Sequence, residues 1–496
     1  MFKKLPIFYN ALLLTGVNLL LRLVSTGFGV YISGRIGAAG VGLLQLVLSV
    51  GALAITAAMA GARTATMYLT AQELGKRHPQ NVARVLSVCF LYSILISSCI
   101  SAALYCLAPT LSRLWIGNPD TTPAIRLYAG IIPVICLCGV MSGYFTAANR
   151  IGTLVAVEVA EQLCAIVVTV LALTFWAGND SARACQSIIF GNGVGACLTF
   201  MCLLILRHKE KAPIGPSFPL SKRLFAIALP LALADDVKAG ISTTENLMVP
   251  KRLALFTGAL SPLAAFGVVC GMVFPVMMFP AAIIFGLAEL LIPELARCHA
   301  AGSEIRIRYL AKRSLKTVWL YGCFFLGFFL LVGTPLTSAL YQNQEAGIAL
   351  KRYALLVPLL YCDALVDAMT KGLGQQSACV RYNILTSGMD VVCLYFLLPK
   401  YGMDGYFLSF LVTHVINFIL SLRRLLTITG PILDIKHAIL TLFATAVSLW
   451  IASFITNPNL CAAAFVLLFI ASLVLLQVIT KEDISWLTGL ACIKSN

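Results

Sequence analysis

Two basic side chains, Arg22 and Lys238, lie inside long apolar segments of this 496-residue chain. An ionisable group costs at least about 2.5–3.5 kcal/mol at the centre of a lipid-spanning helix, so it normally faces a partner or a water-filled cavity. Positive charge in such a cavity suits a phosphate or pyrophosphate group. The alternative is that both groups form ion pairs that hold helices together. We favour the cavity, because the two residues fall in the first helix of each predicted half of the chain.

Seven acidic residues in apolar segments are candidates for balancing this charge or for binding a coupling cation: Asp235, Asp236, Glu245, Glu161, Asp363, Asp367 and Asp390. Asp235 and Glu245 lie three and seven residues from Lys238, so the three side chains share one stripe of a helix. Asp363 and Asp367 are four residues apart, and for them structural pairing and cation binding stay open as equal alternatives.

Glu161 and Asp390 occupy equivalent places in an internal repeat. The stretches 143–163 and 372–392 each begin with glycine at a helix junction and carry a carboxylate eighteen residues later. For these two carboxylates we favour structural pairing between helices. The repeat predicts two halves of six helices in parallel orientation, which is typical of transporters.

The elements that position these residues are membrane helices. Hydrophobic residues make up 60% of the chain and charged residues 11%, with a mean hydropathy of +0.92, which excludes an ordinary soluble protein. We predict an all-α polytopic membrane protein with about fourteen spans, near residues 6–33, 39–68, 82–107, 123–147, 150–176, 183–206, 222–248, 259–288, 310–334, 348–371, 376–399, 403–425, 434–455 and 459–480. We expect two six-helix lobes and two appended helices, divided as 1–206, a cytoplasmic linker at 207–221, 222–426, and 427–496 with a cytoplasmic tail.

The net charge of +16 indicates topology. Of the 36 lysines and arginines, 24 fall in the set of connections that contains the N-terminus, nine in the opposite set and three within helices. Basic residues accumulate in cytoplasmic loops, so both termini are predicted to be cytoplasmic. This account of the charge removes the reason to expect nucleic acid as a partner.

No motif for enzymatic chemistry is present. The five histidines are scattered, no Gly-rich loop ends in GK[ST], and the seventeen cysteines include no CxxC pair. We therefore expect neither an enzyme nor a bound cofactor or metal, and we interpret the cysteines as small core residues.

Four stretches carry a family resemblance: GAAGVGLLQL at 37–46, GYFTAANRIGTLVAVEVAEQL at 143–163, FGVVCGMVFPVMMFPAAIIFGLAELLIPELA at 266–296 and KGLGQQSACVRYNILTSGMDVV at 371–392. They resemble the polysaccharide-transport and stage V sporulation protein B-like branch of the multidrug/oligosaccharidyl-lipid/polysaccharide exporter superfamily. The resemblance implies two lobes around a cavity that opens alternately to either side. In the lipid-flipping branches, basic residues of the first helix hold the pyrophosphate of an undecaprenyl-linked sugar, and Arg22 matches such a position. The last two helices form a groove for the lipid tail in those branches, and 434–455 and 459–480 match this pair.

These features favour one function over two alternatives. We expect a flippase for a lipid-linked oligosaccharide or peptidoglycan precursor in the bacterial cytoplasmic membrane, with membrane lipids and a Na⁺ or H⁺ coupling ion as further partners. An ion-coupled multidrug antiporter of the same superfamily is the alternative, although residues 1–72 lack the acidic residue that such antiporters typically carry in the first helix. A membrane scaffold for cell-wall or spore-coat synthesis, without transport, is the third hypothesis.

Overall fold

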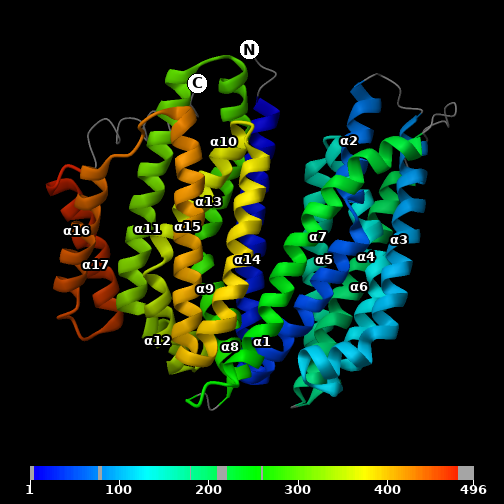
Figure 1. The fold of residues 1–496 in the computed structure, drawn as a ribbon, viewed down its shortest axis with the longest axis horizontal. Helices are drawn as coiled ribbons and strands as arrows, with labels where there is room; N and C mark the ends of the chain where they lie inside the picture. Colours follow the sequence, from blue (N-terminus) through cyan, green and yellow to red (C-terminus); the bar gives the residue numbers. More distant parts are fainter. Residues whose placement is uncertain (1–4, 76–80, 179, 209–219, 259–260, 479–496) are drawn as a thin grey trace. The chain divides into compact units, whose positions relative to one another are not determined.

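The structure is a computed structural model that describes residues 5–75, 81–178, 180–208, 220–258 and 261–478. All regular secondary structure within these ranges is helical (Figure 1), which confirms the predicted class. Among the described residues, ten helices are long and apolar enough to cross a membrane, or up to twelve if each of two bent pairs is one span. The predicted count of fourteen spans is therefore not confirmed. Most of the predicted linker, 209–219, and the predicted tail from 479 onward lie outside the described residues.

The chain folds into two compact units. Unit 1 comprises residues 1–271 and 387–406, and unit 2 comprises 272–386 and 407–496. This division differs from the predicted lobes. The seventh predicted span and the second half of the eleventh predicted span belong to unit 1, whereas both were expected in the second lobe. The lobe boundaries given above stay a prediction.

Unit 1 consists mainly of α1 to α8. Their bounds are α1 Leu5–Met59, α2 Ala62–Gly75, α3 Val82–Thr110, α4 Thr122–Ala147, α5 Ile151–Ala172, α6 Ser181–His208, α7 Leu220–Leu253 and α8 Pro262–Gly267, with the second half of α14 (Gln376–Tyr401) added. Short π-helical turns at Leu111–Ile116 and Leu173–Ala177 extend α3 and α5.

The α1 helix is broken at Gly37, which has φ 69° and ψ 176°. This left-handed backbone conformation favours glycine, since a side chain would be strained there. The break falls within the predicted connection between the first two spans, at 34–38. A second break at Ala60 and Gly61, both with positive φ, separates α1 from α2.

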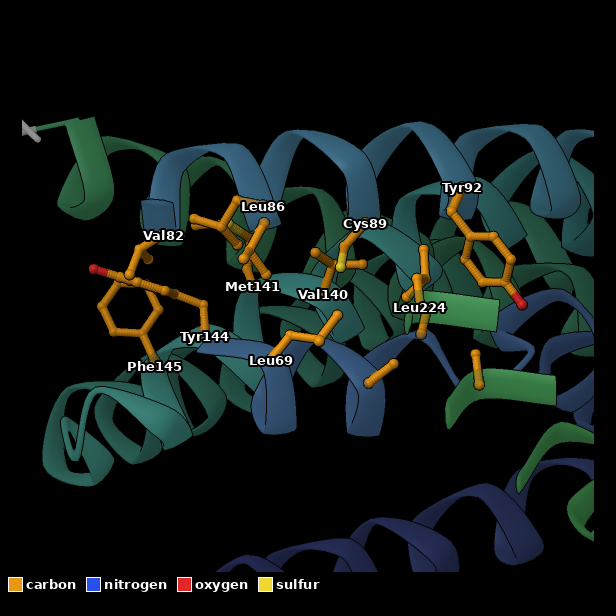
Figure 2. Packing of buried hydrophobic residues seen from close by; sticks show 14 of the residues in the cluster. Leu69, Val82, Leu86, Cys89, Tyr92, Val140, Met141, Tyr144, Phe145 and Leu224 are labelled. Carbon is orange, nitrogen blue, oxygen red and sulfur yellow. The ribbon is translucent and has the colours of Figure 1, made fainter. Parts of the chain in front are cut away.

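The core of unit 1 lies where α2, α3, α4 and α7 meet. Figure 2 shows Leu69, Cys89, Val140 and Leu224 converging from these four helices. All four side chains are buried, and the Tyr92 hydroxyl at the edge of the cluster donates to the backbone oxygen of Ala60 at 2.9 Å. The tyrosine thereby satisfies a carbonyl at the break between α1 and α2, which lipid could not do.

Unit 2 contains the remaining helices. Their bounds are α9 Phe274–Met278, α10 Ala281–Ala300, α11 Glu304–Tyr341, α12 Gln344–Ala354, α13 Val357–Gly372, α15 Met403–Thr429 from its second turn onward, α16 Ile435–Ala452 and α17 Pro458–Leu475, with the first half of α14 added. Pro280 ends the short α9, and proline removes a helix hydrogen bond. The hydroxyls of Tyr361 and Tyr321 donate to the backbone oxygens of Met277 and Pro280 at 2.8 and 2.9 Å, so carbonyls on both sides of this break are satisfied.

The appended helices α16 and α17 pack on α11 (Figure 1). Phe324 of α11 lies against Phe465 and Phe469 of α17, with ring centroids 5.8 and 5.6 Å apart. Gly327 lets the Phe465 ring approach α11, because a Cβ at this position would clash with that ring. Aromatic packing therefore fixes α17 to unit 2.

Candidate functional site

The predicted basic residue Arg22 lies in the first part of α1, where its side chain is half-buried. The Gln162 side-chain amide of α5 donates to the backbone oxygen of Leu21 at 3.2 Å and to the hydroxyl of Ser25. These bonds tie α1 to α5 beside the arginine. Arg22 and Arg35 are the only charged residues of α1, so this helix brings only positive charge into the membrane.

Glu161, which directly precedes Gln162 on α5, bonds to a different helix. Its Oε2 accepts a hydrogen bond of 2.7 Å from the Thr199 hydroxyl of α6. A Cβ added at Gly195 of α6 would lie only 3.1 Å from the Glu161 backbone oxygen, so the two helices pack closely here. The hydrogen bond joins α5 to α6, and pairing between helices is the role that we favour for the Glu161 carboxylate.

The predicted α7 residues differ in their surroundings. Lys238 and Asp235 are exposed, and within the described ranges neither forms an ion pair. Asp236 is half-buried, and its buried Oδ1 has no hydrogen-bond partner among the described residues. Among the described residues, no ion pair therefore links Lys238 to another helix.

Further along α7, polar side chains fix this helix to α1. The Thr243 hydroxyl donates to the backbone oxygen of Ser49 at 3.2 Å, and the Asn246 amide donates to the Ser49 hydroxyl at 3.0 Å. Glu245 lies between these two residues in the sequence. The segment of α7 that carries Glu245 is therefore held by α1.

Glu245 of α7 forms a side-chain hydrogen bond with Asp390 of α14. A hydrogen bond between two carboxyl groups requires that one of them carries a proton, because two carboxylates are both acceptors. Asp390 is buried with 6% of its surface exposed. This pair joins two predicted site residues that lie 145 positions apart in the sequence, and it can hold a proton or a cation between its oxygens.

A second acidic site lies in unit 2, where α13 faces α15. The Asn417 amide donates to both oxygens of Asp363, at 3.0 and 3.1 Å, and His414 Nδ1 lies 3.5 Å from Asp363 Oδ2. The His414 ring packs on Phe410, with centroids 4.2 Å apart. An amide clamp and an imidazole thus hold the Asp363 carboxylate in one orientation.

These groups line a cavity of about 190 Å³, which Asp367 also lines. Asp367 Oδ2 pairs with Lys371 Nζ at 2.6 Å, one turn along α13, whereas its buried Oδ1 has no hydrogen-bond partner among the residues described. Asn383 lines the same cavity. Carboxylate and amide oxygens suit hard cations, so the cavity has the chemistry of a cation or proton site.

Several polar residues of these sites were missed in the sequence. His414 was considered only as a scattered histidine, and Asn417 and Gln162 carry no charge and form no motif. A usable signal existed, because His414 and Asn417 are polar residues three positions apart inside an apolar span. Within the described ranges, no cluster of three or more His, Cys, Asp or Glu could hold a metal ion.

Comparisons with known proteins show which proteins this chain resembles. The MatE family model matches residues 15–171. Stage V sporulation protein B of Bacillus subtilis (strain 168) is 20% identical over 412 residues, which cover 80% of this chain and 79% of that protein. The chain is therefore similar to members of the multidrug/oligosaccharidyl-lipid/polysaccharide exporter superfamily. The similarity includes the stage V sporulation protein B-like branch, and the long apolar helices of the described residues indicate a multi-pass membrane protein.

Solved structures of this superfamily share the fold. The lipid II flippase MurJ, in an inward-closed conformation, has a TM-score of 0.73 at 12% identity, and the match covers 95% of this chain and 99% of that one. An inward-facing multidrug resistance MATE family transporter has a TM-score of 0.66 at 15% identity, covering 84% of this chain and 98% of that one. The fold therefore extends over nearly the whole described chain.

Proposed function

We propose that this chain is a flippase that moves a lipid-linked oligosaccharide or peptidoglycan precursor, carried on undecaprenyl pyrophosphate, across the bacterial cytoplasmic membrane by alternating access. The observation that carries the proposal is that α1 contains Arg22 inside its apolar first part and no acidic residue. The Arg22 guanidinium can bind pyrophosphate oxygens with two parallel hydrogen bonds. A cationic drug would instead require negative charge on this helix.

The appended helices support a lipid substrate. The likeness to the lipid II flippase covers 95% of this chain and the likeness to the multidrug transporter 84%, and this difference of about 55 residues is large enough to include α16 and α17, which have 18 residues each. Helices beyond the twelve that we predict for the two lobes are suited to guide a polyprenyl tail that is too apolar for water. The sugar head, which is too polar for hydrocarbon, would cross through the cationic interior.

The test compares two arginines of the same helix. Arg22→Gln should slow flipping of an undecaprenyl-pyrophosphate-linked sugar in proteoliposomes by tenfold or more, since a charge-assisted hydrogen bond is worth about 1.5–3 kcal/mol. Arg22→Glu and Lys238→Glu should abolish it. Arg35→Gln, which removes the same charge from an exposed site on α1, should retain the wild-type rate. Full activity of both Arg22→Glu and Lys238→Glu would disprove the cavity assignment.

A second candidate function is favoured by the cavity of unit 2. Its acidic groups, Asp363 and Asp367, could couple efflux of a cationic drug to Na⁺ or H⁺. If the chain is an antiporter, ion-dependent efflux of a cationic dye should be present and should be lost in Asp363→Asn. Asp180→Asn, which removes a carboxylate paired with Arg183 at the start of α6, is the matched control. Absence of dye efflux in the wild type would exclude this function.

A further inference from the structure

The first half of α1 packs loosely, although it carries Arg22. Of the residues from 16 to 31 whose burial the structure describes, none is buried. Leu20 and Leu23, on either side of Arg22 in the sequence, are both more than half exposed. Helices associate in lipid mainly through close packing of side chains. Apolar packing therefore does little to fix the direction of the Arg22 side chain.

The second half of α1 does not fix that direction either, because the helix is broken at Gly37. The glycine has φ 69° and ψ 176°, and no atom lies within 4 Å of a Cβ added there. A break in the helical backbone lets the two segments turn relative to each other. Beyond it, residues 40–44 are buried, and a Cβ added at Gly42 would lie only 2.2 Å from the backbone oxygen of Leu263. The firmly packed part of α1 thus begins after the break, whereas Arg22 lies before it.

Gln162 of α5 connects directly to the loosely packed half. Its side-chain nitrogen donates to the backbone oxygen of Leu21 at 3.2 Å and to the hydroxyl of Ser25. A primary amide carries two N–H groups, so both bonds can exist at once. The two acceptors lie one helical turn apart and enclose Arg22 in the sequence. Two fixed points on one turn determine both its place and its rotation.

The rotation of this turn decides where Arg22 points. An α-helix advances by about 100° per residue, so Arg22 lies about 80° around the axis from the midpoint between Leu21 and Ser25. A rotation by one residue would bring Leu23 to the direction that Arg22 now occupies. A leucine cannot bind an anion. The bonds from Gln162 therefore keep a guanidinium, and not an isobutyl group, in that direction.

The α5 helix is itself held firmly at this level. Glu161 accepts a hydrogen bond of 2.7 Å from the Thr199 hydroxyl of α6. One turn further along α5, a Cβ added at Gly191 of α6 would lie only 2.7 Å from the backbone oxygen of Ala165. The backbones of α5 and α6 thus approach closely next to Gln162. The side chain that holds α1 projects from a rigid pair of helices, which is what precise placement of a functional group requires.

We propose that Gln162 is the positioning residue of the Arg22 site: its two hydrogen bonds hold the first half of α1 so that the guanidinium faces the pyrophosphate. This inference rests on the proposed function, in which Arg22 binds that group. Without the bonds, the first half of α1 adopts other positions as well. The affinity for the substrate then falls with the fraction of molecules in which the guanidinium is correctly placed. Gln162 acts through Arg22 and needs no contact with the substrate.

Binding of undecaprenyl pyrophosphate to the purified full-length chain in nanodiscs tests the proposal. Gln162→Met keeps the length of the side chain but removes both donors, and it should weaken binding about tenfold, a change that two neutral hydrogen bonds can produce. Ser25→Ala removes one of the two acceptors and should cause a smaller loss. Ser101→Ala is the matched control, because it removes a hydrogen bond to the Ala129 backbone oxygen that joins α3 to α4. This control should bind like the wild type.

A double-variant cycle separates positioning from a general structural role. In the Arg22→Gln background, Gln162→Met should cause no further loss of affinity, since no guanidinium remains to be placed, whereas the effects of independent residues add. If Arg22→Gln weakens binding and Gln162→Met adds its full loss to it, or has no effect in the native chain, the inference is wrong and the proposed function stands. If Arg22→Gln binds normally, both are wrong.

Hydrogen–deuterium exchange of the same chains tests the placement of α1 without any substrate. In Gln162→Met, peptides from residues 16–31 should exchange faster than in the wild type, because the first half of α1 has lost its attachment to α5. Peptides from residues 38–50 should exchange at the wild-type rate. Unchanged exchange at 16–31, or an equal increase in both segments, would overturn the inference whatever the binding measurement gives.

Discussion

At the scale of single residues, the carboxyl pair of Glu245 and Asp390 has the clearest chemical consequence. A buried hydrogen bond between two acids needs a proton or a cation between them, because two bare carboxylates repel each other in a medium of low dielectric constant. An exchangeable proton or ion held inside the membrane is what coupling to an ion gradient requires. Coupling to an ion gradient is therefore our prediction for this pair.

Replacement of either acid should uncouple transport from the ion gradient. In Glu245→Gln or Asp390→Asn, the amide can donate the hydrogen bond permanently, so the helices stay paired while the exchangeable charge is lost. We expect transport that no longer responds to an imposed Na⁺ or H⁺ gradient, measured in proteoliposomes, with normal protein yield. Glu161→Gln is the matched control, because Glu161 bonds only to the Thr199 hydroxyl in the described contacts. Gradient-dependent transport in both pair variants would contradict the assignment.

The two acidic residues of the unit 2 cavity differ in their hydrogen-bond partners. Asp363 is clamped by Asn417, whereas Asp367 has one partnered and one unpartnered oxygen among the residues that the structure describes. We expect Asn417→Leu to lower thermal stability, because it leaves the buried Asp363 without its donors at a cost of about 1–3 kcal/mol. Asn417→Asp would place two acids together and should make stability fall as pH rises. Thermal unfolding of the purified variants at pH 6 and pH 8 measures both effects, and equal stability of Asn417→Leu and the wild type would refute the clamp.

At the scale of elements, the attachment of α17 to α11 depends on one small residue. Gly327→Ala would push the added methyl group into the Phe465 ring, which is fully buried between Phe324 and Phe469 and has little room to move. Overpacking of this kind costs about 1–3 kcal/mol. A lower unfolding temperature is expected for Gly327→Ala, and none for Gly388→Ala, since no atom lies within 4 Å of a Cβ added at Gly388. If α17 guides the lipid tail, Gly327→Ala should also slow flipping.

At the scale of the whole molecule, the distribution of basic residues predicts which ends of the helices face the cytoplasm. Ser303, between α10 and α11, belongs to the predicted cytoplasmic side, and Asn457, before α17, belongs to the opposite side. In intact cells, a membrane-impermeant thiol reagent should label the Asn457→Cys variant more than it labels the native cysteines of the wild-type chain. The Ser303→Cys variant should be labelled no more than the wild type. Labelling in the reverse order would overturn the predicted topology and place both termini outside.

The sequence alone determined the class of this protein, because lipid as a solvent requires long apolar helices and a strong bias of charge. It also identified the carboxylates of the two acidic sites, since a charge in an apolar span is conspicuous. It could not show that Glu245 bonds to Asp390 or that Asp363 is clamped by Asn417. These contacts join residues far apart in the chain, and periodicity constrains only neighbours on one helix. The tertiary structure decided them, because only the packing of helices determines which polar groups share a cavity and which face lipid.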